Sequence, residues 1–104
     1  MSNVEYQSGD LIFEWDAEKA AFNLRKHNIS FETAANVFFD ENRIEKLDKE
    51  HSYNEDRWKV LGKVAEVLLV IYTEREDKTR IISARKATPK ERRIYYGNGD
   101  LYFA

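Results

Sequence analysis

The chain has 104 residues, no cysteine, 42% hydrophobic and 13% aromatic residues, and a formal net charge of −2. This length fits a single domain over residues 1–104, with a core over about 11–96 and tails over 1–10 and 97–104, and the lack of cysteine excludes a disulfide scaffold. The start "MSNVEYQSGD" has no basic or apolar signal region, and the longest apolar run, "VLLVIY", is too short to cross a bilayer, so we expect a cytoplasmic protein with no membrane role.

The first half of the chain predicts one strand followed by two helices. "LIFEWD", residues 11–16, predicts the strand, and Asp16 can cap a helix that ends in "RKH" before Asn28. The apolar stripe expected on this helix consists of Ala17, Ala20, Ala21 and Leu24. Ser30 can cap a second helix, whose stripe consists of Phe31, Ala34, Ala35 and Phe38. We expect these helices to form an αα-hairpin.

The second half predicts four strands and a last helix. The strands are expected in "RIEKLD", "RWKVLGKV", "EVLLVIYTE" and "TRIISAR", with a turn over residues 62–66. Thr88, Pro89 and Glu91 have the spacing of a capping box with proline at the first helical position, and this helix should end near Gly97. The order β-α-α-β-β-β-β-α predicts an α+β fold in which the helices cover one face of an antiparallel sheet and leave the other face partly open.

Positive charge is concentrated near the end of the chain, where residues 75–96 carry eight basic and three acidic residues. Because side chains alternate along strands, Arg57 and Arg85 are expected on the open sheet face, with Tyr72 or Thr73 between them. Such a pair could bind phosphate through its planar forks of donors. The alternative is that both arginines are ordinary solvated residues with carboxylate partners. The net negative charge argues against indiscriminate coating of DNA.

The two histidines, His27 and His51, allow different interpretations. His27 suits the negative end of a helix dipole, whereas His51 lies in a charged loop where an imidazole could transfer protons. Asp48, His51 and Glu55 could ligate a metal, but Asp-x-x-His spacing is common and no fourth ligand is evident, so we expect no metal site. Glycine-rich phosphate loops, serine elbows and cysteine nucleophiles are missing from the sequence, which excludes many enzyme classes. Trp15 and Trp58 could stack on bases, although both are better explained as core residues.

Four segments together resemble a known family: "FEWDAEKAAFNLRKHNISFETA", "DKEHSYNEDRWKVLG", "LLVIYTER" and "RIISARKATPKERRIYY". In order and without large gaps, they are similar to the BrnT toxins, also described as DUF497, of type II toxin–antitoxin systems. The resemblance implies a RelE-like α+β fold and a metal-independent endoribonuclease that needs no cofactor and inhibits translation. It also implies neutralisation by a BrnA-like antitoxin, through which alone operator DNA is bound.

The resemblance also implies roles for individual residues. Phosphate and transition-state contacts are expected from Arg57, Arg75 and Arg85. Proton transfer is expected from His51, Glu55 and Tyr72, and further substrate contacts from Lys26, His27, Lys59 and Arg80. Among the clustered cations, we expect Arg85 to act on phosphate, while Lys90, Arg92 and Arg93 solvate the last helix or contact the antitoxin. Two other functions remain open: a non-catalytic module that docks an antitoxin or nucleic acid, and a structural subunit that binds an acidic partner.

Overall fold

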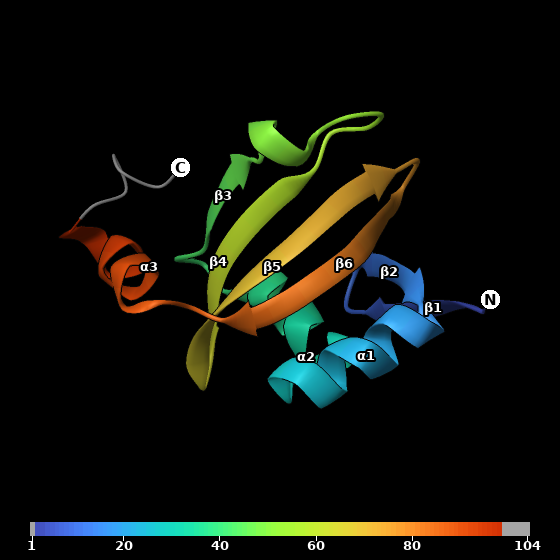
Figure 1. Ribbon diagram of the computed structural model, residues 1–104, viewed down its shortest axis with the longest axis horizontal. Helices are drawn as coiled ribbons and strands as arrows, with labels where there is room; N and C mark the ends of the chain where they lie inside the picture. Colours follow the sequence, from blue (N-terminus) through green and yellow to red (C-terminus); the bar gives the residue numbers. More distant parts are fainter. Residues whose placement is uncertain (1, 99–104) are drawn as a thin grey trace.

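Six strands form one mixed sheet in the computed structural model, which describes residues 2–98 (Figure 1). The strands are β1 Asn3–Ser8, β2 Leu11–Asp16, β3 Ile44–Leu47, β4 Trp58–Val64, β5 Glu66–Arg75 and β6 Lys78–Lys86. Their order across the sheet is β1-β2-β6-β5-β4-β3. The helical segments are α1 Ala17–His27, α2 Phe31–Ala35, η1 Asn36–Phe39, η2 Lys49–His51, α3 Pro89–Arg93 and η3 Ile94–Asn98. The predicted α+β class is confirmed.

The N-terminal segment differs from the prediction. Residues 3–8, predicted to lie in a tail, form β1, which pairs antiparallel with β2 across a turn where Gly9 adopts φ +57°. Strand β2 then pairs parallel with β6, so the sheet is mixed rather than antiparallel. The predicted element order was wrong by one strand, because Val4 and Tyr6 alternate with polar residues and pack against the core. Residues 99–104 of the predicted C-terminal tail lie outside the described residues.

One side of the sheet, the inner face, carries Val60, Val70 and Ala84 and is covered by α2 and η1. The stripe expected on the second helix is confirmed, because its first three members are buried and Phe38 packs against them. Segment η1 lies so close to β4 that a Cβ atom on Gly62 would be 2.6 Å from the Cβ of Val37. Gly62 itself lies within β4, so the predicted turn over residues 62–66 starts too early.

The opposite side, the outer face, carries Lys59, Ile71 and Arg85 and is covered at one end by α3 and η3. Ile94 packs there in a second apolar cluster with Leu61, Val67, Leu69 and Ala87. The prediction that all three helices lie on one face was therefore wrong. Strands β4 and β5 carry buried apolar residues on both faces, so each face can hold a helix.

Helix α1 lies beside the C-terminal half of β6, beyond the residues of β6 that pair with β2 (Figure 1). Asn23 makes this contact: its side-chain amide donates to the backbone oxygen of Ala84 at 2.9 Å, and its amide oxygen accepts from the N–H of Ala84 at 3.1 Å. The amide also donates to the oxygen of Ile29 at 3.0 Å. Asn23 thus replaces a neighbouring strand at this edge of β6 and is only 5% exposed.

The predicted helix ends agree with the structure. Asp16 and Ser30 accept hydrogen bonds from the third residue after each, Asn28 adopts the left-handed conformation, and Thr88 forms a reciprocal capping box with Glu91. The stripe expected on α1 was wrong, since Ala21 and Leu24 are exposed and Asn23 takes the buried position. None of the helices among residues 2–98 is long and apolar enough to cross a membrane.

Candidate active site

The outer face carries a groove between α1 on one side and η2 with β4 on the other. It consists of a larger hollow of about 950 Å³ beside α1 and a smaller one of about 350 Å³ beside η2. Both hollows share a floor formed by Leu69, Ile71, Ile82, Ser83 and Arg85. We call the two hollows together the central groove. Arg85 is the charged residue at their junction.

Arg85 is held in a defined orientation by Glu91 of α3. Its Nη1 and Nη2 atoms donate to the two carboxylate oxygens of Glu91 at 2.8 and 3.0 Å, and Nη1 also donates to the backbone oxygen of Lys86 at 3.1 Å. These contacts use one edge of the guanidinium group. The Nε–H and the second N–H of Nη2 lie parallel on another edge of the guanidinium. These two donors make no hydrogen bond within residues 2–98. Arg85 therefore keeps one two-donor fork available.

Glu91 connects this fork to the start of α3. Its carboxylate also accepts from the backbone N–H of Thr88 at 2.9 Å, which completes the capping box. Burial raises the pKa of Glu91, but the hydrogen bonds from Arg85 and Thr88 outweigh it and leave the pKa below its usual value. Glu91 is therefore a stable carboxylate that fixes Arg85.

The smaller hollow brings together two other predicted residues, His51 and Arg57. The Nδ1 atom of His51 lies 2.9 Å from a carboxylate oxygen of Asp48, which is buried beneath it. Arg57 is anchored through its backbone: its N–H donates to the hydroxyl of Ser52 at 2.9 Å, and its oxygen accepts from the N–H of Asp48 at 2.7 Å. Its guanidinium group makes no hydrogen bond or ion pair within the described part of the chain.

Lys26, His27, Lys59 and Arg80 were predicted to contact substrate, and all four line the central groove. Lys26 and His27 line the larger hollow from the last turn of α1, and Lys59 lines the smaller one from β4. Arg80 also borders the larger hollow, but it is engaged by Asn3 at 2.7 Å and by Glu14 at 3.3 Å. The predicted cations Arg57 and Arg85 therefore share one groove with these residues.

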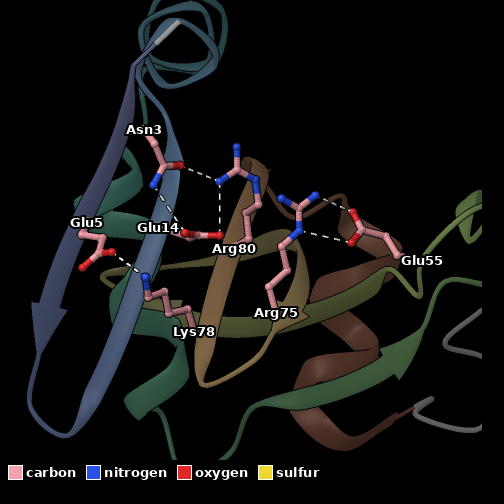
Figure 2. Close-up of polar contacts among 7 residues, drawn as sticks. All are labelled: Asn3, Glu5, Glu14, Glu55, Arg75, Lys78 and Arg80. Atoms are coloured by element: carbon pink, nitrogen blue, oxygen red, sulfur yellow. Dashed lines mark hydrogen bonds and ion pairs between the residues drawn. The ribbon is translucent and has the colours of Figure 1, made fainter.

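Two other predicted site residues, Arg75 and Glu55, form an ion pair elsewhere on the outer face (Figure 2). The Nε and Nη2 atoms of Arg75 donate to the Glu55 carboxylate at 3.2 and 2.8 Å, and neither residue lines the groove. In the strand register, Arg75 pairs with Lys78 and Leu69 pairs with Arg85. The two arginines are therefore offset by six positions along β5, or about 20 Å. The hydrogen bond from Arg75 lowers the pKa of Glu55.

Figure 2 shows that the Arg75–Glu55 pair ends a row of charged contacts across β1, β2, β6 and β5. Lys78 contacts Glu5 at 2.5 Å, and Arg80 contacts Glu14 beside it. All these side chains project from the outer face, opposite the apolar residues of the same strands. Each of these cations has a carboxylate partner, which favours a structural role; the Arg80–Glu14 pair is largely buried and the other two pairs are partly exposed.

Tyr72 or Thr73 was predicted to lie between Arg57 and Arg85, and the first alternative was wrong because Tyr72 lies on the inner face. Tyr72 is 4% exposed in the inner-face core, where its ring packs edge-on against Phe38. Its hydroxyl donates to Glu45, and burial together with this bond raises the pKa of the phenol. Thr73, its neighbour on the outer side, is also buried and donates to the backbone oxygen of Asp56 at 2.6 Å.

One group of side chains could hold a metal ion among the described residues. Ligand atoms of Asp48, Glu50 and His51 all lie within 4.8 Å of one another, whereas Glu55 is bound to Arg75. The third possible metal ligand in the structure is therefore Glu50 and not Glu55, which the sequence analysis had considered. Sequence reasoning also missed Glu91 as a groove residue, although its capping-box spacing had placed it at the start of α3.

Comparison with protein families shows that residues 15–91 match the family described as "Ribonuclease toxin, BrnT, of type II toxin-antitoxin system". No curated protein matches the chain. A solved structure that is similar is the crystal structure of the Brucella abortus ribonuclease toxin BrnT, with a TM-score of 0.54 and 23% sequence identity over 71% of this chain and 92% of that chain. That likeness concerns the fold. Because the family match covers most of the chain, this protein belongs to the BrnT family of ribonuclease toxins of type II toxin–antitoxin systems.

Proposed function

We propose that this protein is an endoribonuclease that binds an RNA phosphate in the central groove and thereby inhibits translation. The observation that carries the proposal is the available fork of Arg85. The Glu91 carboxylate occupies one edge of the guanidinium and leaves two parallel N–H donors, which match the spacing of two phosphate oxygens. An arginine with all its donors paired, such as a purely structural one, would not leave this fork available.

The proposed reaction is attack of the RNA 2′-hydroxyl on the adjacent phosphorus atom. The new 2′-oxygen–phosphorus bond forms as the 5′-oxygen leaves, the 2′-proton passes to a base, and the leaving oxygen takes a proton. Negative charge builds up on the phosphorane oxygens, where Arg85 and Arg57 can stabilise it. The products are a 2′,3′-cyclic phosphate and a 5′-hydroxyl.

His51 is the proposed proton-transfer group. It lines the same hollow as Arg57 and Arg85, and Asp48 orients its ring from below. Tyr72 lies on the inner face, and Glu55 is bound to Arg75 outside the groove, so neither residue can reach an RNA phosphate at Arg85 to transfer a proton. Lys26, His27 and Lys59 are proposed to contact the flanking backbone of the RNA.

The proposal extends to partners. We expect a BrnA-like antitoxin to bind the central groove and to make the contacts with operator DNA, because the toxin itself has a formal charge of −2. We place the activity in the cytoplasm, where RNA is translated.

The direct test is incubation of the purified protein with a mixed RNA in EDTA, followed by chemical analysis of the product ends. Cyclic phosphate and 5′-hydroxyl ends formed in EDTA are expected. Products with 5′-phosphate ends, or cleavage that needs added magnesium, would contradict the mechanism. If RNA is bound but never cleaved, the alternative of a non-catalytic binding module is correct.

A further inference from the structure

Helix α1 presents an aromatic ring to the central groove and buries an amide. Phe22 is 56% exposed and lines the larger hollow, whereas the adjacent Asn23 is 5% exposed. This is the reverse of the usual amphipathic arrangement. The three hydrogen bonds of Asn23 to Ala84 and Ile29 fix the rotation of the helix, and Phe22 remains outside as a consequence.

The surroundings of Phe22 are cationic. The Nζ atom of Lys26, one turn further along α1, lies 5.8 Å from the centre of the Phe22 ring. The larger hollow carries the four cations Lys19, Lys26, Arg80 and Arg85, against the two acids Asp16 and Glu18. Arg80 and Arg85 are paired with Glu14 and Glu91, whereas Lys19 and Lys26 of α1 make no ion pair within residues 2–98. A flat apolar surface beside lysines that are available to phosphate suits a base attached to a phosphate backbone.

We propose that Phe22 is the stacking platform for a nucleobase of single-stranded RNA, next to the phosphate held by Arg85. The proposal rests on the ribonuclease function and adds a base-binding subsite to it. Arg85 belongs to both hollows, so a strand whose phosphate lies at the Arg85 fork can place a flanking base in the hollow beside α1. Stacking on Phe22 favours an unpaired base of any sequence, because every base has a π face.

The tryptophans do not take this role. Trp15 is 2% exposed in the core, and Trp58 packs against the same inner-face cluster. Of the other exposed aromatic residues among residues 2–98, Phe39, Tyr53 and Tyr96, none lines the central groove. Phe22 is therefore the aromatic side chain of the described structure that a groove-bound base can reach.

The test uses the full chain and 2′-O-methyl oligoribonucleotides, which cannot be cleaved because the 2′-oxygen is blocked. One 2-aminopurine is moved along the oligonucleotide, and its fluorescence falls when it stacks. At one position we expect strong quenching with the wild type and little with Phe22→Ala, and roughly tenfold to a hundredfold weaker binding, as for the loss of one base–aromatic stack. Phe22→Trp should restore both signals, and Phe22→Leu should not.

Leu24→Ala is the matched control, because Leu24 is an apolar residue of the same helix, 47% exposed, that does not line the groove. It should bind like the wild type. Equal RNA binding by wild type and Phe22→Ala would overturn the subsite, and if Phe22→Ala then loses antitoxin binding, Phe22 is a protein anchor instead. If Arg85→Ala is inactive while Phe22→Ala is normal, only the subsite fails. If the wild type neither binds nor cleaves RNA, the ribonuclease function itself fails.

Discussion

Arg85 and Glu91 lie six residues apart, yet they face each other across the turn between β6 and α3. The carboxylate fixes one edge of the guanidinium and so orients the fork that we assign to phosphate. An arginine fixed in this way needs little reorganisation when charge develops on the substrate, which is the condition for strong electrostatic catalysis. In the proposed function Glu91 is thus a positioning residue for Arg85.

The first prediction concerns Arg85. Arg85→Ala should lower the rate of RNA cleavage by about 10² to 10³, because it removes transition-state donors, and Arg85→Lys should recover little since lysine has no fork. Rates are measured on an oligoribonucleotide, with circular dichroism to verify folding. Arg93→Ala, at an exposed position of α3, is the control and should change the rate by less than about tenfold, as expected for a distant steering charge. A folded Arg85→Ala variant with near wild-type rate would refute the assignment.

The second prediction separates two roles for His51. If it transfers a proton, the wild-type rate should change between about pH 5.5 and 7.5, and His51→Ala should be slow and insensitive over that range. If it ligates a metal with Asp48 and Glu50, Glu50→Gln and EDTA should abolish cleavage as well. We expect Glu50→Gln to retain activity in EDTA, because it removes a metal ligand without altering the imidazole.

At the scale of elements, Asn23 holds α1 against the sheet. The third prediction is that Asn23→Ala lowers the free energy of unfolding by about 2–4 kcal/mol, because the N–H and oxygen of Ala84 are left buried without partners. Urea unfolding measures this change. Leu24→Ala, one residue further and exposed, should change it by less than about 0.5 kcal/mol. A similar loss in both variants would mean that helix packing, not the amide, fixes α1.

Docking of α3 depends on the charge of Glu91, which gives the fourth prediction. Its folded pKa lies below the ordinary 4.5, so the carboxylate stabilises the fold above pH 4.5, and this contribution is lost as pH falls through the folded pKa. The difference in unfolding free energy between wild type and Glu91→Gln should therefore shrink below pH 4.5. Urea titrations from pH 6 to pH 3 test this, and a difference that grows on acidification would contradict it.

Local sequence chemistry was enough to predict the helix ends, because Asp16, Ser30 and Thr88 cap through neighbours three residues away. It was not enough for features that depend on distant partners. Asn23 is buried because its side chain bonds to Ala84, 61 residues away. In the sequence alone, the alanine-rich stripe of the same helix was the more apolar side and was therefore predicted to be buried. Tyr72 lies in a run that is apolar on both faces, so alternation could not say which face its ring would occupy.

The same limit applies to the candidate site. Arg57 and Arg85 were correctly assigned to one face, since Arg57 precedes Trp58 and Arg85 follows Ala84, both of which pack in the inner-face cluster. Arg75 could not be separated from them, because position along a strand depends on register, which the sequence does not state. Strand β1 was missed although Val4 and Tyr6 alternate ahead of a Gly-Asp turn, a hairpin signal that was available.

At the scale of the whole molecule, the fifth prediction is that antitoxin and RNA compete for the central groove. The antitoxin should displace a labelled 2′-O-methyl oligoribonucleotide in proportion to the fraction of toxin that the antitoxin occupies. Arg57→Glu should weaken the binding of both the antitoxin and the oligoribonucleotide. Arg93→Glu, on α3 and outside the groove, is the control for RNA binding and should leave it unchanged. Detection of a ternary complex, or a complex that leaves Arg57 and Arg85 open to solvent, would indicate inhibition from a different surface. The toxin alone should bind operator DNA only weakly.

The parallel pairing of β2 with β6 also bears on how the toxin is synthesised. Residues 12–14 pair with β1 on one side and with residues 78–80 of β6 on the other, and β6 lies between β2 and β5 in the middle of the sheet. During translation the N-terminal hairpin therefore lacks this neighbouring strand until residues 40–77, which lie between η1 and β6, and then β6 itself have been synthesised. Arg85 and Glu91 follow, near the end of β6 and in α3. A nascent chain stopped before β6 would lack the strand that joins β2 to β5 and would lack Arg85, so the proposed ribonuclease activity should appear only after β6 and α3 have been synthesised.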